Sequence, residues 1–66
     1  MIIFLNGEKR EIERAASIAE MVEELTLPAL AVLIEHNGIA LHRGEWVDAK
    51  LNADDRIEVL RIVAGG

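Results

Sequence analysis

The chain opens with a hydrophobic run that turns back into a polar one. Ile2 to Leu5 consists of residues that favour strands. Asn6-Gly7 follows, a pair suited to a tight hairpin turn because both positions of a type I′ turn need positive φ. The sequence therefore predicts a hairpin whose return strand covers Glu8 to Arg14. Since Ile12 is the only apolar residue in the middle of that strand, we expect it to lie at a sheet edge, protected from self-pairing by charge.

A helical pattern comes next. Ser17-Ile18-Ala19-Glu20 fits a capping box, in which Ser17 caps an exposed amide and Glu20 reaches back to the amide of Ser17. Apolar residues then recur at i, i+3, i+4 and i+7, which places them on one helical face that must pack on something apolar. Pro28 ends the helix. The apolar face consists of Ile18, Met21, Val22 and Leu25.

The second half of the chain predicts three further strands. The unbroken apolar run Ala29 to Ile34 suits a strand that is buried on both faces or that faces a partner. Asn37-Gly38 predicts a second hairpin turn, with Ile39 to His42 returning. The last strand is predicted from Arg56 to Val63, after a turn at 52–55. Between these strands, we expect Trp46, Val47 and Leu51 to close one end of the core.

This order of elements predicts an α+β fold. A hairpin, a crossover helix and further strands indicate a mixed sheet of four to five strands with one main helix packed on one face. A right-handed crossover places the last strand parallel to the first, which is the β-grasp arrangement. We expect residues 1–66 to form a single domain of this kind.

Composition narrows the classes of function. The chain has no cysteine and only two histidines, so we expect neither disulfides, nor a zinc site, nor thiol chemistry on its own side chains. The net charge of −5 argues against nucleic acid, whose phosphates require a basic surface. No segment resembles a membrane span or a signal peptide, so we expect a cytoplasmic protein without a membrane partner.

The sequence finishes in residues with almost no side chain, Ala64-Gly65-Gly66. Glycine lacks Cβ and reaches backbone angles that other residues avoid, so such a tail can pass through a narrow channel. We expect residues 64–66 to be flexible and to fit a partner's channel, with the α-carboxylate of Gly66 as the group available for chemistry.

An ordered set of segments, rather than one motif, gives the chain its character. The segments are Leu5-Asn6-Gly7, Ser17 to Val22, Glu35-His36-Asn37-Gly38, Arg43-Gly44-Glu45-Trp46, Asp55 to Val59 and Ala64-Gly65-Gly66. Through this set the whole chain resembles the ThiS family of sulfur carriers in thiamine biosynthesis, which have a ubiquitin-like β-grasp fold. His42 and Asp54 depart from the family's usual proline and glycine, and neither change touches the tail.

The resemblance implies a carrier rather than an enzyme. A ubiquitin-activating-like adenylyltransferase would adenylate the carboxylate of Gly66 with ATP, so the carrier itself would bind no cofactor. Sulfur from a donor of the cysteine desulfurase type would replace AMP to give a thiocarboxylate, and thiazole synthase would take that sulfur into the thiazole ring. Alternatives are the small subunit of molybdopterin synthase, a modifier conjugated to lysines, and a non-covalent β-grasp binding module.

Alternation along the strands also predicts a partner-binding surface. If Ile57 and Val59 face the helix, Leu60 and Ile62 face outward. By the same reasoning, Ile2 and Phe4 face outward from the first strand. If the first and last strands are neighbours, we expect these four outward side chains to form one apolar patch, joined by Leu33.

Overall fold

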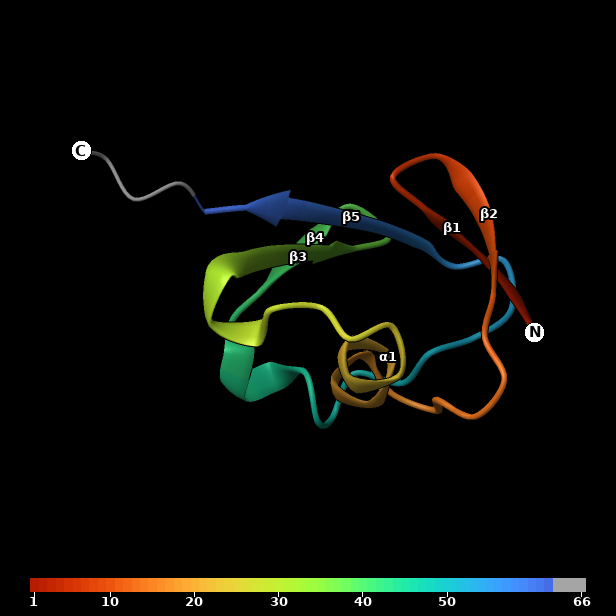
Figure 1. Cartoon of the computed structure of the whole chain (residues 1–66), viewed down its shortest axis with the longest axis horizontal. Helices are drawn as coiled ribbons and strands as arrows, with labels where there is room; N and C mark the ends of the chain where they lie inside the picture. Colours follow the sequence, from red (N-terminus) through yellow and green to blue (C-terminus); the bar gives the residue numbers. More distant parts are fainter. Residues whose placement is uncertain (63–66) are drawn as a thin grey trace.

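The computed structural model describes residues 1–62 and folds them into a five-stranded sheet with a helix against one face (Figure 1). The strand order is β2-β1-β5-β3-β4, with β1 parallel to β5 and the other pairs antiparallel. This confirms the α+β, ubiquitin-like β-grasp fold. The elements are β1 Ile2–Leu5, β2 Glu8–Glu11, α1 Ile18–Glu24, the 3-10 turn Ala29–Ala31, β3 Val32–His36, β4 Ile39–Leu41, the 3-10 turn Arg43–Glu45 and β5 Arg56–Arg61.

Both predicted hairpin turns are present. Asn6 and Gly7 have φ of 50° and 82°, and Asn37 and Gly38 have φ of 51° and 85°. Positive φ at two successive positions is the type I′ geometry, whose twist matches that of the flanking strands. The turn residues therefore determine where each hairpin reverses.

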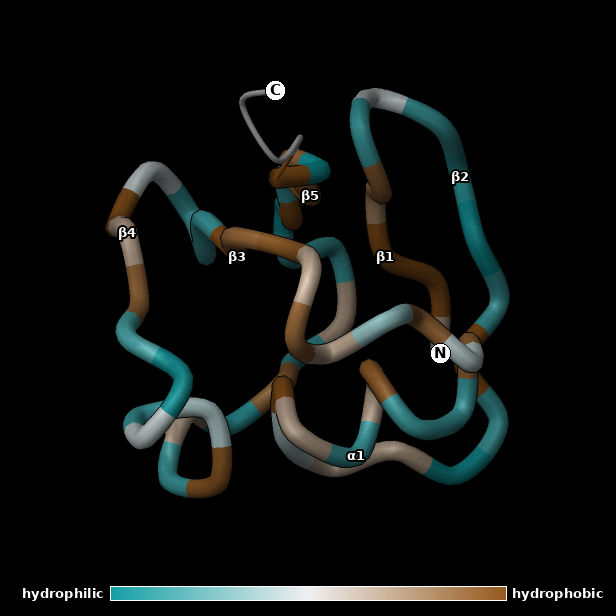
Figure 2. Tube along the Cα trace, turned by 60° about the vertical axis from the view of Figure 1, so that its left-hand side comes forward, coloured by the Kyte–Doolittle hydropathy of each residue, from teal (hydrophilic) through white to brown (hydrophobic). Residues whose placement is uncertain are grey.

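β2 is shorter than predicted and ends at Glu11 rather than Arg14. All four of its residues are exposed, and Figure 2 shows this hydrophilic strand beside the hydrophobic β1. Ile12 follows the strand and is buried, with its N–H donating to the carbonyl of Met1 at 2.7 Å. The N-terminal amine of Met1 donates in return to the carbonyl of Ile12 at 2.8 Å, so the backbone contact with the start of the chain continues through this buried residue.

The helix begins as predicted, but its capping box differs in one contact. Ser17 Oγ accepts from the N–H of Glu20 at 3.1 Å. The carboxylate of Glu20 accepts from Ala16 N–H at 2.7 Å, not from Ser17 as expected. The side chain of Glu20 thus reaches one residue further toward the N-terminus than the predicted capping box.

The apolar run that follows Pro28 is not a strand buried on both faces. Residues Ala29–Ala31 form a 3-10 turn, and β3 begins only at Val32. Within β3, Val32 and Ile34 are buried whereas Leu33 is 55% exposed. The helix covers only one face of the sheet, so successive side chains of β3 alternate between buried and exposed. The sequence had suggested instead that both faces of this strand are buried.

The connection from β4 to β5 closes one end of the core with Trp46 and Leu51, as predicted. Val47 does not take part, since it is 67% exposed. The side chain of the preceding residue, Trp46, is buried in the core instead. The main-chain carbonyl of Trp46 accepts from the N–H of Ala19 at the start of α1. The buried apolar core consists of Ile3, Ile12, Ala15, Ile18, Met21, Val22, Val32, Ile34, Trp46, Leu51 and Ile57.

The predicted phase of the last strand is confirmed. Ile57 is fully buried and Val59 packs against the core, whereas Leu60 is 52% exposed. β5 ends at Arg61 instead of Val63, which lies outside the described residues. In residues 1–62, no helix has the length and apolar character needed to cross a bilayer.

Candidate functional site

β5 leads the chain out of the centre of the sheet toward the predicted tail. It lies between β1 and β3 (Figure 1). The buried Asp55 precedes it, and Ile62, the last described residue, follows it. The predicted reactive residues Ala64, Gly65 and Gly66 lie outside the described residues. The part of the site that the structure does show is therefore the surface at the base of the tail.

An apolar cluster covers the open face of the sheet at this base. Leu33 of β3 lies directly opposite Leu60 of β5, and the N–H of Ile62 donates to the carbonyl of Ala31 at 2.7 Å. Leu33, Leu60 and Ile62 are each about half exposed, although all three are large apolar side chains. We call these three residues the tail-side cluster.

Ile2 and Phe4 lie on the same face but not in the same cluster. The register pairs Phe4 with Arg56, so Leu60 is four residues further along β5, a distance of about 13 Å at roughly 3.3 Å per residue. The expected single patch of Ile2, Phe4, Leu60 and Ile62 is therefore wrong. β1 reaches only the beginning of β5, and this register separates two apolar groups on one face.

Charged side chains occupy the space between the two groups. Arg56 and Glu58 follow Phe4 along the open face, and Glu58 lies directly opposite Glu35 of β3. A shallow hollow of about 440 Å³ is lined by Glu35, Arg56 and Glu58 with the β3–β4 turn. Among residues 1–62, the only contact between a basic and an acidic side chain within salt-bridge distance lies elsewhere, between His36 and Asp55.

Asp55 fixes the beginning of β5, which sequence reasoning treated only as part of a turn. Its carboxylate lies 2.8 Å from Nε2 of His36 and accepts from Nδ2 of Asn37 at 3.1 Å and from the N–H of Asn52 at 2.8 Å. Burial raises the pKa of Asp55, but the hydrogen bonds from His36, Asn52 and Asn37 outweigh it and hold the pKa below its ordinary value. The cluster ties β5 to the β3–β4 hairpin.

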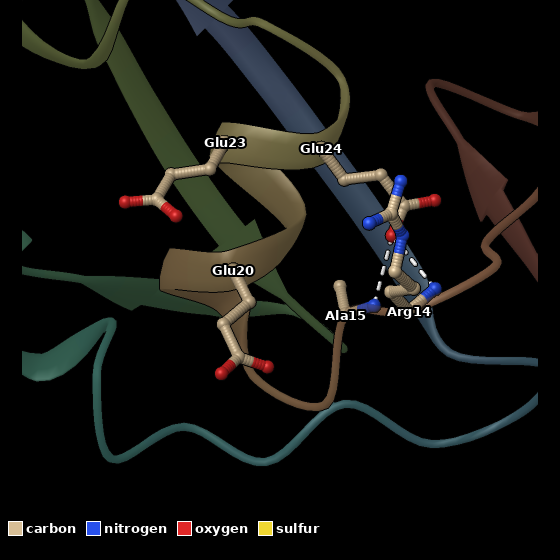
Figure 3. A pocket seen from close by; sticks show the side chains of 5 residues that line it. All are labelled: Arg14, Ala15, Glu20, Glu23 and Glu24. Carbon is tan, nitrogen blue, oxygen red and sulfur yellow. Dashed lines mark hydrogen bonds between the residues drawn. The ribbon is translucent and has the colours of Figure 1, made fainter.

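A second carboxylate fixes the loop between β2 and α1. Glu24 accepts from the backbone N–H of Glu13 at 2.8 Å. It also accepts from those of Arg14 and Ala15 at 2.9 and 2.8 Å, and Figure 3 draws these two bonds. The hydrogen bonds from Glu13 and Arg14 lower the pKa of this carboxyl group. Glu24 lies outside the apolar face that the sequence predicts for the helix, and nothing in the sequence pattern indicates that it binds these amides.

The surface depression beside Glu24 offers no catalytic constellation. Its volume is about 520 Å³, and its lining adds Glu20 and Glu23 to Arg14, Ala15 and Glu24. Carboxylates and one guanidinium supply no activated nucleophile. In the described residues, no group of three or more His, Cys, Asp or Glu side chains could hold a metal ion.

Comparison with known proteins identifies the family. The model of the ThiS family matches residues 3–66. This chain belongs to the ThiS family. The resemblance seen in the sequence is thereby confirmed, and the match continues through Ala64, Gly65 and Gly66.

Solved structures agree with the ThiS assignment. A crystal structure of a thiamine biosynthesis protein, ThiS, from Geobacter metallireducens is 28% identical and covers 100% of both chains, with a TM-score of 0.84. A solution structure of a thiamine biosynthesis protein from the same organism is also 28% identical and covers 100% of this chain and 88% of the other, with a TM-score of 0.78.

A curated relative is a much longer protein. It is named thiazole synthase, comes from Magnetococcus marinus and is 32% identical over 66 residues. All of this ThiS-family chain is matched, but the match spans only 20% of the relative's length.

Proposed function

We propose that this protein is a sulfur carrier of thiamine biosynthesis, and that the α-carboxylate of Gly66 carries the sulfur. The observation that supports this most directly is the family match over residues 3–66, which includes the Ala64-Gly65-Gly66 segment. The similarity to a thiamine biosynthesis protein over the full length of both chains supports the assignment to this pathway.

The proposed chemistry begins with activation of the carboxylate. A carboxylate oxygen is a poor leaving group, so an adenylyltransferase would join Gly66 to AMP and release pyrophosphate from ATP. The terminal sulfur of a cysteine persulfide on a donor protein would then attack the acyl carbon and expel AMP. A second thiol would cleave the resulting acyl disulfide and leave the thiocarboxylate. The carrier contains no cysteine, so it has no internal thiol to attack its own activated end.

The geometry of the described residues suits a carrier that is recognised by its partners. The tail-side cluster of Leu33, Leu60 and Ile62 lies beside the base of the tail. Exposed apolar side chains that adjoin one another are typical of an interface. A partner that covers this cluster would hold the domain while the small residues of the tail enter its channel.

Thiazole synthase is the proposed recipient of the sulfur. A protein of that name contains a stretch similar to this whole chain. The presence of a carrier-like segment within a thiazole synthase supports a functional link between the two. The adenylyltransferase and the desulfurase-type donor are the partners that the family resemblance implies, and they would supply the activation and the sulfur that the proposed chemistry needs.

Intact-mass measurement tests the proposal. After incubation with the adenylyltransferase, ATP and a persulfide donor, the mass should increase by the difference between one sulfur and one oxygen. The matched variants are a deletion of Gly66, which should abolish the gain, and Glu23→Gln on the helix, which should not affect it. A gain of sulfur by the truncated protein would place the reactive group elsewhere.

A second assay tests the pathway. The thiocarboxylate form is mixed with thiazole synthase and its substrates, and separately with the large subunit of molybdopterin synthase. Sulfur incorporation into the thiazole ring is the expected result. Transfer only in the molybdopterin reaction would reassign the protein to that pathway, and transfer in neither would leave the carrier without a role in either.

A further inference from the structure

The backbone of β5 hydrogen-bonds to different neighbours at alternate residues. On one side it pairs with β3, through Leu60 opposite Leu33 and Glu58 opposite Glu35. The N–H of Ile62 continues this series by donating to Ala31, and the carbonyl of Arg56 begins it by accepting from Asn37. Even-numbered residues of β5 thus direct their N–H and C=O groups toward β3.

Odd-numbered residues direct the same groups toward β1. The carbonyl of Asp55 accepts from Phe4 N–H at 2.9 Å, and the carbonyl of Ile57 accepts from Asn6 N–H at 2.8 Å. At Val59, β1 has already ended, and the side chain of Asn6 takes its place. Its Oδ1 accepts from Val59 N–H at 2.7 Å, and its Nδ2 donates to the Val59 carbonyl at 3.4 Å.

Arg61 is the next odd-numbered residue, and within residues 1–62 it has no neighbour on that side. Its N–H and C=O point beyond the Asn6-Gly7 turn, where the described part of the chain places no strand. Figure 1 shows β5 continuing past the tip of the β1–β2 hairpin while β3 still runs beside it. The central strand of the sheet therefore becomes an edge strand in its last residues.

The side chains around this open edge differ from those of the outer edge at β2. Every residue of β2 is charged, which discourages pairing with another strand. Next to Arg61, the residues on the open face are Leu60 and Ile62, which are 52% and 47% exposed. The N–H and C=O of Arg61 are thus available to hydrogen-bond to another strand, and apolar side chains lie on either side of them. Protein segments that bind by adding a strand to a sheet use this combination.

We propose that this open edge binds an extended segment of thiazole synthase, which adds to the sheet as a strand beside Arg61 and covers Leu60 and Ile62. This inference rests on the proposed function. An extended polypeptide is the ligand that fits, because it supplies a donor and an acceptor at the spacing of a strand, with side chains that alternate toward the apolar face. The added strand would continue the line of β1, and Asn6 would mark where it stops.

Amide hydrogen exchange tests this directly. In the free protein the Arg61 N–H should exchange faster than that of Leu60, which faces β3. When thiazole synthase binds, the exchange of the Arg61 N–H should slow at least tenfold. Binding that leaves this amide unprotected would overturn the inference while leaving the proposed function intact, whereas failure to bind thiazole synthase would count against both. Protection of the amide in concentrated carrier alone would make a second copy the occupant and would also overturn it.

A pair of substitutions at one position separates backbone from side chain. Arg61→Pro removes the N–H, and proline is tolerated in a strand where that N–H faces away from the neighbouring strand. Arg61→Ala removes the same side chain but keeps the N–H. Both variants should melt at similar temperatures, and Arg61→Pro should bind thiazole synthase about tenfold more weakly than Arg61→Ala. Equal affinities, or a proline variant that fails to fold, would contradict the proposal that the Arg61 N–H is unpaired in the free protein and donates to the partner.

Discussion

The side-chain amide of Asn6 pairs with both backbone groups of Val59, a residue 53 positions away in the sequence. Asn6 also has a φ of 50° in the turn between β1 and β2. One residue thus forms the hairpin turn and extends the contact of β1 with β5 beyond the end of β1. The β1–β2 turn and the attachment of β5 to the end of β1 therefore both depend on Asn6.

Replacing Asn6 should separate these two roles. Asn6→Gly keeps the positive φ but loses the amide, and we expect a loss of about 1 kcal/mol in the free energy of unfolding. Asn6→Ala loses the amide and adds the strain of an alanine at positive φ, so it should be less stable than Asn6→Gly. Urea titration of both variants measures the difference. Equal stability of Asn6→Gly and the wild type would show that the bonds to Val59 contribute nothing.

Thr26 should be a position at which stability can be gained. It follows α1 and has a φ of 51°. Its N–H donates to the carbonyl of Glu23, and the N–H of Leu27 donates to the carbonyl of Val22. These two bonds form a Schellman motif, in which the residue with positive φ is usually glycine. A β-branched residue is strained in the left-handed region, so Thr26→Gly should stabilise the fold by about 1 kcal/mol. Thr26→Ala keeps the Cβ atom, so it should not give the same increase in stability. A lower melting temperature for the glycine variant would contradict this reading.

Asp55 should dominate the loss of stability in acid on the sheet side of the protein. Because its pKa is lowered in the folded protein, its contribution is present above the ordinary pKa of the unfolded chain and is lost as the pH falls through the folded value. Asp55→Asn should cost about 1–3 kcal/mol at neutral pH and flatten the decline in stability toward acid. Unfolding titrations across that range check it, and an unchanged acid slope in the variant would refute it.

Glu24, in the contact between α1 and the loop before it, should also make the stability of the fold decrease toward acid pH. Its carboxylate holds three backbone N–H groups and its pKa is lowered, so its contribution also disappears as the pH falls through the folded value. Glu24→Gln should lower the melting temperature at neutral pH and increase amide exchange at Glu13, Arg14 and Ala15. The matched control is Glu23→Gln, whose side chain points away from these amides in Figure 3. Equal melting temperatures for the two variants would contradict the prediction.

The two apolar groups on the open face should respond differently to a charge. Leu60→Glu places the carboxylate on a half-exposed site, so the melting temperature should change little while sulfur transfer to and from partners weakens. Phe4→Glu replaces a half-buried ring, so it should destabilise the fold more. Thermal melts and transfer rates for both variants separate the cases. Wild-type transfer by a folded Leu60→Glu variant would remove the tail-side cluster from the proposed interface.

Local chemistry in the sequence determined the elements of this protein and the direction in which their side chains point. Asn-Gly pairs specify both hairpins, since few other pairs accept two positive φ values. Ser17 and the spacing of Ile18, Met21 and Val22 specify the helix and its buried face. Alternation around Ile57 specifies which side of the last strand is open, because strand side chains alternate with a period of two.

Only the tertiary structure decided how far each strand extends along its neighbour. Two residue pairs join β1 to β5, and this short overlap separates Phe4 from Leu60. Among residues 1–62, it also leaves the N–H and C=O of Arg61 without a strand on the side away from β3. The contacts of Asp55 with His36 and of Glu24 with the amide of Glu13 likewise join residues 19 and 11 positions apart. Periodicity fixes the face on which a side chain lies but not the register between distant strands. That register depends on how the core packs and on the path of the connections, which no local pattern contains.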